Sequence, residues 1–119
     1  MTAAQPHSGP HILGLRQIEP AELNPLLNAQ IALWSSLLHW DFEPSANLVR
    51  RFVSMRALAG CVLVDGHRVG GYAYYVVEHN KALIGDLFLS DAYRTVENED
   101  LLLAAAVEAI RIHHAVDRI

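Results

Sequence analysis

Cysteine is nearly absent from this chain of 119 residues, in which Cys61 is the only one. A single cysteine excludes a disulfide within the chain, and so little cysteine is typical of a reducing compartment, so we expect the cytoplasm. The thiol is followed by Val-Leu-Val and has no basic neighbour that would stabilise a thiolate. Cys61 is therefore predicted to be an unreactive strand residue.

Positive charge and long apolar runs are also scarce. Nine Lys and Arg residues stand against 13 Asp and Glu residues, for a net charge of -4. Without a basic run, nucleic acid is not an expected partner. The longest apolar run, residues 101–107, is far shorter than the ~20 residues that cross a bilayer. The first eleven residues lack the basic start and apolar run of a signal peptide, so no membrane association is expected.

The sequence shows no metal-binding pattern. Its seven histidines have no regular ligand spacing, and the adjacent His113 and His114 cannot both project from one face of a helix. We therefore expect no metal site.

What the chain does have is an apolar composition suited to one domain. Hydrophobic residues make up 52%, slightly above the ~45–50% of soluble domains, which suggests an apolar surface covered by a partner or by a missing segment. Residues 1–10 are rich in Ala, Ser, Gln, Gly and Pro and are predicted to be a disordered lead. Residues 11–119 are predicted to form a single domain.

The N-terminal half predicts one strand and two helices. Partial alternation indicates a strand over residues 11–18, and apolar residues recurring every three or four positions indicate a helix over residues 21–40. A second helix is predicted from Ser45, as its N-terminal cap. The apolar residues that define the two helices are Leu23, Leu27, Ile31, Trp34 and Leu38 in the first, and Leu48, Phe52 and Met55 on one side of the second.

The C-terminal half predicts a hairpin-rich sheet followed by a helix. Strands are expected over residues 61–64, 69–77 and 82–89, with a tight turn at Asp65-Gly66, then a helix over residues 97–114. Residues 115–119 look like the start of a fifth strand. The order β-α-α-β-β-β-α-β predicts an α/β (α+β) protein with a mixed sheet and helices on its faces.

The most informative segment is residues 84–94, an apolar strand that ends in Asp-Ala-Tyr-Arg and leads into a helix. A strand end beside a helix N-terminus is where anionic cofactors bind. Together with the Val-Gly-Gly-Tyr-Ala-Tyr-Tyr and Gly-Asp-Leu-Phe-Leu stretches of residues 69–75 and 85–89, it resembles the GNAT superfamily of acyl-CoA N-acyltransferases, closest in pattern to its polyamine and diamine acetyltransferases. The resemblance covers residues 12–119, the N-terminal two-thirds of that fold, so we expect a fold truncated after the fifth strand.

The resemblance implies acetyl-CoA as cofactor. Backbone amides of the last strand before the turn would hold the pantetheine arm and polarise the thioester, and the turn and helix start would hold the pyrophosphate. Glu97 and Glu99 stand where the family has small residues, and their charges would repel phosphate. Alternatively they are first-turn acids that stabilise a helix, with Asn98 as its cap. The residues implied for cofactor binding are Leu87, Phe88, Leu89, Arg94, Thr95, Val96, Glu97, Asn98 and Glu99.

The resemblance also implies a base and an acceptor site. Gly85 stands where diamine acetyltransferases have a glutamate, so Asp86 is the candidate base, with Glu78 as the nearest substitute. Trp40, Asp41 and Glu43 lie between the first two helices, where the family binds its acceptor. Aromatic rings and acids suit a cationic amine there, although Trp40 is also explained as a core residue.

Two functions are consistent with these features. One is acetyl transfer from acetyl-CoA to a small amine. The other is a non-catalytic GNAT-like domain acting in dimerisation or as half of a tandem protein. A fifth strand at the sheet edge would be open and apolar, so we expect a homodimer or a missing C-terminal segment to cover it.

Overall fold

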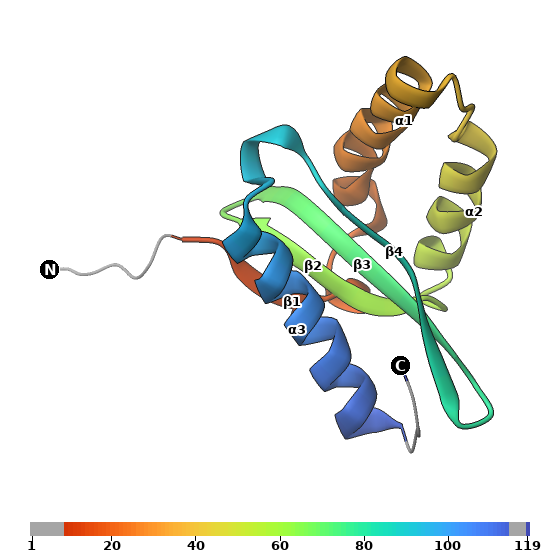
Figure 1. The fold of residues 1–119 in the computed structure, drawn as a ribbon, viewed down its shortest axis with the longest axis vertical. Helices are drawn as coiled ribbons and strands as arrows, with labels where there is room; N and C mark the ends of the chain where they lie inside the picture. Colours follow the sequence, from red (N-terminus) through yellow and green to blue (C-terminus); the bar gives the residue numbers. More distant parts are fainter. Residues whose placement is uncertain (1–8, 115–118) are drawn as a thin grey trace, which may run out of the picture.

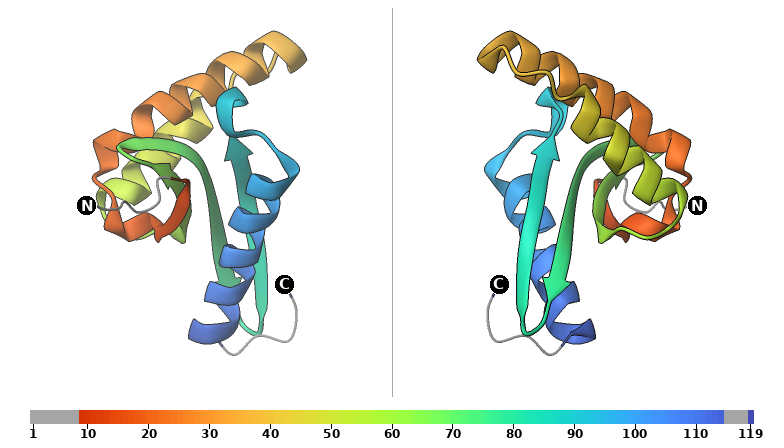
Figure 2. Two further views of the ribbon diagram at one scale, coloured as in Figure 1. Left: turned by 90° about the vertical axis from the view of Figure 1, so that its left-hand side faces the viewer. Right: turned by 90° about the vertical axis from the view of Figure 1, so that its right-hand side faces the viewer.

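The computed structural model describes residues 9–114 and residue 119. Within these residues, four antiparallel strands form one sheet in the order β1-β2-β3-β4. Helices α1 and α2 pack on one face of the sheet, and α3 lies on the other (Figures 1 and 2). The strands are β1 (His11–Gly14), β2 (Ala59–Asp65), β3 (Arg68–Glu78) and β4 (Lys81–Leu89), and the helices are α1 (Asn24–Leu38), α2 (Glu43–Ser54) and α3 (Val96–His113).

Alternation along β2 builds two hydrophobic cores. Val62 and Val64 face α1 and α2, whereas Cys61 and Leu63 face α3. Because successive strand residues point to opposite faces, this apolar run serves both layers at once. The predicted α+β class, the three helices and the β2–β4 meander are confirmed, and Cys61 is buried as expected. The predicted fifth strand falls on residues 115–119, of which the structure describes only Ile119.

Two N-terminal boundaries were predicted wrongly. The first strand ends at Gly14 because Leu15–Gln17 form a 3-10 turn, in which the Gly14 amide donates to Oε1 of Gln17 at 2.6 Å. The first helix opens with a 3-10 turn, Pro20–Leu23, and ends before His39, whose φ of 51° is left-handed. A backbone in that region cannot continue a right-handed helix.

The second helix differs from the prediction in its start and its buried side. It begins at Glu43, so Ser45 lies inside the first turn rather than capping it. The residues predicted to share one apolar side are exposed, at 52% for Leu48, 41% for Phe52 and 58% for Met55. The buried side consists instead of Ala46, Val49 and Val53.

Arg50 gives a physical reason for this orientation of α2. Its guanidinium donates to the side-chain oxygens of Asn24 at 3.0 Å and Asn28 at 2.8 Å, both on α1. These bonds fix Arg50 against α1 and thereby turn the smaller apolar residues of α2 toward the sheet.

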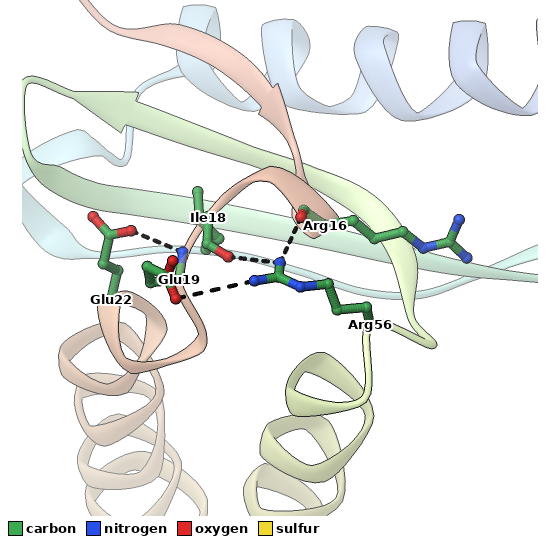
Figure 3. A network of polar contacts seen from close by, with 5 residues as sticks. All are labelled: Arg16, Ile18, Glu19, Glu22 and Arg56. Atoms are coloured by element: carbon green, nitrogen blue, oxygen red, sulfur yellow. Dashed lines mark hydrogen bonds and ion pairs between the residues drawn. The ribbon is translucent and has the colours of Figure 1, made fainter.

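A second arginine connects the end of α2 to the chain between β1 and α1 (Figure 3). Nη1 of Arg56 donates to the carbonyl oxygens of Arg16 at 2.6 Å and Ile18 at 3.2 Å, and Nη2 lies 4.0 Å from Glu19. The Glu19 amide donates in turn to Glu22 at 2.9 Å, which holds the start of the first helical segment. Arg56 reaches these groups from a left-handed backbone with a φ of 53°.

We expect Arg56→Ala to lower the free energy of unfolding by about 1–3 kcal/mol, because two carbonyl oxygens lose a charged donor. Arg56→Gly should cost about 1 kcal/mol less than Arg56→Ala, because glycine has no Cβ to oppose a left-handed φ. Urea unfolding of the two variants measures both effects. Arg51→Ala, at an exposed position on the preceding helix α2, is the matched control and should stay within about 0.5 kcal/mol of the parent protein. Equal free energies of unfolding for Arg56→Ala and Arg56→Gly would contradict a left-handed backbone at this position.

Candidate functional site

An irregularity in the sheet marks the centre of the candidate site. Tyr74 of β3 pairs with Asp86 of β4, but the next pair is Tyr75 with Ile84, so Gly85 is an extra residue in a β-bulge. A Cβ built on Gly85 would overlap the Tyr74 ring, with its Cζ only 2.7 Å away. Glycine therefore allows the ring to lie against the backbone of β4, and the bulge changes the direction of the strand where Asp86 begins.

A cavity lies beside this bulge, on the face of the sheet covered by α1 and α2. We call it the aromatic cavity; its volume is about 230 Å³. The rings of Trp34 and Trp40 are 6.2 Å apart, and Trp40 meets Phe42 edge-on at 5.1 Å. Clustered ring faces of this kind attract cations. The cavity is lined by Trp34, Trp40, Phe42, Ser45, Val49, Tyr74, Gly85 and Asp86.

The carboxylate at the cavity is positioned by two buried polar side chains. Oδ2 of Asp86 accepts a hydrogen bond from Nε2 of Gln30 at 2.7 Å and lies 3.3 Å from the Tyr72 hydroxyl. That hydroxyl donates to Oε1 of Gln30 at 2.7 Å, which closes a three-residue network. Gln30 is 0% exposed, and the pKa of Tyr72 is raised by burial and by the negative charge of Asp86. The Tyr72 phenol therefore remains a neutral donor across the physiological pH range.

The outer edge of β4, which pairs with no described strand, continues from this carboxylate. The Leu87 amide donates to Oδ1 of Asp86 at 2.9 Å, and the Leu89 carbonyl accepts from Arg94 at 2.7 Å, whereas the Ser90 amide bonds to β3. Because hydrogen-bond direction alternates along an antiparallel strand, Leu87 and Leu89 both present their backbone groups to this outer edge. The Leu89 amide therefore points to the same edge as the Leu87 amide, which is already hydrogen-bonded to Asp86.

A second cavity, the edge groove, of about 310 Å³, follows this edge. Trp34 borders both cavities and stacks obliquely on Phe88 with 6.2 Å between ring centroids. Residues 85 and 86 of β4 line the aromatic cavity, and residues 87–89 line the edge groove. The groove is lined by Leu33, Trp34, Leu37, Leu87, Phe88, Leu89, Arg94 and Glu99.

Arg94 lies at the end of the groove next to the N-terminus of α3. Its Nη1 is 2.6 Å from Oδ1 of Asp91, its Nη2 bonds the Leu89 carbonyl, and its guanidinium lies 5.6 Å from the Phe88 ring centroid. Arg94 therefore already has an acidic partner, but the pair is solvent-exposed and an anion can compete for it at little cost.

Thr95 caps α3, which corrects the prediction that Asn98 does so. Oγ1 of Thr95 accepts from the Asn98 amide at 3.0 Å, and Nδ2 of Asn98 donates to the Tyr93 carbonyl at 2.9 Å. The first two amides of the helix, those of Val96 and Glu97, have no acceptor within the helix. They remain available to an anion.

Comparison with known proteins found matches in structure only. No protein-family model and no curated protein sequence matched this chain. The solved structures that match include a GNAT family acetyltransferase from Brucella melitensis in complex with acetyl-CoA, at 15% identity and a TM-score of 0.71, with 92% of this chain and 73% of that chain covered. A GCN5-related N-acetyltransferase from Ralstonia eutropha JMP134 matches at 12% identity and a TM-score of 0.66, with coverage of 93% and 82%. A GNAT family N-acetyltransferase from Escherichia coli in complex with CoA matches at 17% identity and a TM-score of 0.62, with coverage of 95% and 63%.

The chain has the GNAT fold. At these identities the likeness establishes the fold and leaves the closer resemblance to polyamine and diamine acetyltransferases as a prediction. The order of strands and helices predicted from the sequence is confirmed for the described part of the chain.

The structure brings together most, but not all, of the site residues that the GNAT resemblance implied. Asp86 and Trp40 line the aromatic cavity, and residues 87–89, Arg94 and Glu99 line the edge groove. Asp41 and Glu43 line neither of these two cavities; instead, Oδ1 of Asp41 accepts from the Glu43 amide at 3.1 Å at the start of α2.

Sequence reasoning missed Gln30, although a signal was present. Gln30 follows Leu27 by three residues and precedes Trp34 by four, which places it on the apolar side of α1. A polar residue at such a position is expected to have a buried partner. The described residues contain no group of three or more His, Cys, Asp or Glu side chains that could hold a metal ion.

Proposed function

We propose that this chain transfers an acetyl group from acetyl-CoA to a small cationic amine. The observation that carries the proposal is the arrangement along β4, where the aromatic cavity with its carboxylate adjoins a groove that leads to a helix N-terminus. An amine in the first cavity and a thioester in the second would meet beside Trp34. We also propose that residues 11–119 act as one domain. This domain would carry out the same type of reaction as the acetyltransferases whose structures it resembles.

The residues of the edge groove fit a CoA thioester. The apolar side chains of Leu33, Leu37 and Leu87 suit the pantetheine arm. The outward Leu89 amide offers a hydrogen bond along the strand edge, and Arg94 with the free Val96 amide offers positive potential at the helix N-terminus. Acetyl-CoA would supply an activated acetyl carbon and a thiolate leaving group.

The residues of the aromatic cavity would select and prepare the amine. The rings of Trp34 and Trp40 attract the ammonium form of the acceptor, and Asp86 adds a negative charge at the end of the cavity nearest the groove. Oδ1 of Asp86 retains a further lone pair beyond the bond from the Leu87 amide, whereas Oδ2 faces both Gln30 and the Tyr72 hydroxyl. Asp86 can therefore accept the proton that the amine loses, directly or through one water molecule.

A non-catalytic role is the second candidate, and specific contacts favour it. Arg94 is paired with Asp91, Asp86 occupies the Leu87 amide, and the exposed Glu97 and Glu99 add negative charge where phosphate would bind. In that case the chain would serve as a GNAT-fold module for dimerisation or as half of a tandem protein.

Calorimetric titration with acetyl-CoA distinguishes the two candidates. We expect a dissociation constant between about 1 μM and 1 mM, the range in which KM values usually fall. The double variant Glu97→Gln/Glu99→Gln should bind about threefold to tenfold more tightly, because exposed charges act weakly through solvent. If neither the parent chain nor this variant binds acetyl-CoA, the proposal of acetyl transfer is rejected and the non-catalytic module is favoured.

Thiol release in the presence of putrescine, spermidine or a neutral amine then tests the acceptor. Asp86→Asn should lower kcat/KM at least tenfold for the cationic amines, since general base catalysis contributes about 100-fold or more. Asp100→Asn, at an exposed position outside both cavities, is the control and should leave the rate unchanged. An Asp86→Asn variant as active as the parent would remove Asp86 from the mechanism.

A further inference from the structure

A third cavity lies on the opposite face of the sheet, between α3 and the β1–β2 edge. We call it the α3 cavity; its volume is about 290 Å³. Small residues create the space: glycines at positions 14 and 60 on the strand side, and Ala105 and Ala109 on α3. Because α3 packs mainly over β2 and β3, its flank toward β1 is left without a large side chain to fill the gap. The cavity shares no lining residue with the aromatic cavity or the edge groove.

Tyr75 lines this cavity, and its hydroxyl has no partner among the described residues. Tyr75 is only 6% exposed, and within residues 9–114 no hydrogen bond to its hydroxyl is formed. Its ring packs with Ala82 and Ile110 and meets His114 edge-on at 5.8 Å, so the ring is held in place. Burial raises the pKa of the Tyr75 phenol, which therefore stays protonated and can act as a donor. A buried donor of this kind ordinarily has an acceptor; residues 9–114 supply none, and a group bound in the cavity that Tyr75 lines can provide one.

The charged group at the cavity is a cation without an acidic partner. Arg16 lines the cavity, and its carbonyl is bound by Arg56, but its guanidinium extends away from that network and forms no ion pair in the described part of the chain (Figure 3). The positive charge of Arg16 partly offsets the pKa rise of Tyr75, which indicates that the two groups are close. Besides Arg16 and Tyr75, the titratable side chains that line the cavity are His113 and Cys61. No carboxylate of the described residues lines it.

From these contacts we propose that the α3 cavity binds a small amphipathic carboxylate. The carboxylate accepts hydrogen bonds from Arg16 and from the Tyr75 hydroxyl, and an apolar chain occupies the space between α3 and β2. Cys61 contributes an apolar wall, because burial raises the pKa of its thiol and keeps it neutral. At ~30 Å³ for each water-sized group, the cavity holds roughly ten non-hydrogen atoms, the number in octanoate. This site is independent of the proposed acetyl transfer, which uses the aromatic cavity and the edge groove along β4.

Octanoate, titrated into the full chain by calorimetry, is the direct test. We expect saturable binding with a dissociation constant of about 1 mM or tighter, which is modest for ten well-placed atoms. Octylamine, which has the chain without the negative charge, and acetate, which has the charge without the chain, should each bind at least tenfold more weakly. Octylamine binding as tightly as octanoate, or no saturable octanoate binding, would overturn the proposal.

Variants place the binding at this cavity rather than at another apolar surface. Arg16→Met keeps the aliphatic stem and should weaken octanoate binding at least tenfold, and Tyr75→Phe should weaken it about threefold to tenfold. Arg111→Met removes the same charge from an exposed position of α3 outside the cavity lining and should change nothing. Ala109→Leu fills the space and should abolish binding; if that variant does not fold, Ala105→Val provides the same test. Octanoate binding that survives both Arg16→Met and the filling substitution would overturn the proposal.

Discussion

Gly60→Ala is expected to lower the free energy of unfolding by about 3 kcal/mol or more, at the upper end of what overpacking costs. A Cβ on Gly60 of β2 would overlap the carbonyl oxygen of Ala73 and lie 2.8 Å from the Cα of Tyr74, both on β3. These are backbone atoms in the middle of a paired strand, so a change of side-chain rotamer cannot relieve the overlap. The two central strands would have to separate where Gly60 pairs with Tyr74.

Chemical denaturation with urea, followed by circular dichroism, measures this loss. Gly9→Ala is the matched control, because a Cβ at Gly9 meets nothing within 4 Å, and it should leave the midpoint within the range of surface substitutions, about 0.5 kcal/mol. A Gly60→Ala protein as stable as the control would show that β2 and β3 are further apart than the structure places them.

Gln30→Leu is the second substitution with a large expected effect, a loss of about 2–4 kcal/mol. Leucine fills a similar volume but removes the nearer acceptor of the Tyr72 hydroxyl and the amide donor to Oδ2 of Asp86, so that these two groups keep only their mutual contact at 3.3 Å. The neutral bond contributes about 0.5–1.5 kcal/mol and the bond to the carboxylate about 1.5–3 kcal/mol, and the partial exposure of Asp86 keeps its share at the lower end. Ser36→Leu, exposed on the same helix, is the control and should change stability little.

A double-mutant cycle with Tyr72→Phe tests whether these side chains form one network. Because Gln30→Leu already removes the nearer acceptor of the Tyr72 hydroxyl, the double variant should be more stable than the sum of the single losses predicts, by about 1 kcal/mol. Strict additivity would mean that the two side chains do not interact. Under the proposed function, Gln30→Leu should also raise the KM for a cationic amine, since Asp86 loses the bond that orients it.

The sequence was most informative where local rules and tertiary packing agree. The meander of β2, β3 and β4 follows from β-branched and aromatic runs separated by turn residues, and its three strands lie where they were predicted. The last helix was predicted within one residue at each end, from acids in its first turn and basic residues in its last. Asp86 was singled out through the GNAT resemblance and lies at the aromatic cavity, and its role as a base stays a prediction.

Prediction failed where one pattern allows two packings. Helix α2 carries apolar residues on two sides, and hydrophobic periodicity alone favoured Leu48, Phe52 and Met55 over the smaller Ala46 and Val53. The observed packing instead places Arg50 against α1, where its partners are more than twenty residues away in sequence. Contacts of this kind have no local signal, because each residue by itself is an ordinary polar surface residue.

The sequence by itself determined the order of the elements, the alternation that gives the sheet two apolar faces, and a glycine, Gly85, followed by an acid within a strand. Only the tertiary structure decided that Gln30 and Tyr72 hold that acid, that Tyr74 lies against the glycine, and that Trp34 borders both cavities. The physical reason is range. Strand and helix periodicity act over a few residues, whereas the site is assembled from side chains 14 to 56 positions apart, whose meeting depends on how α1 lies across the sheet.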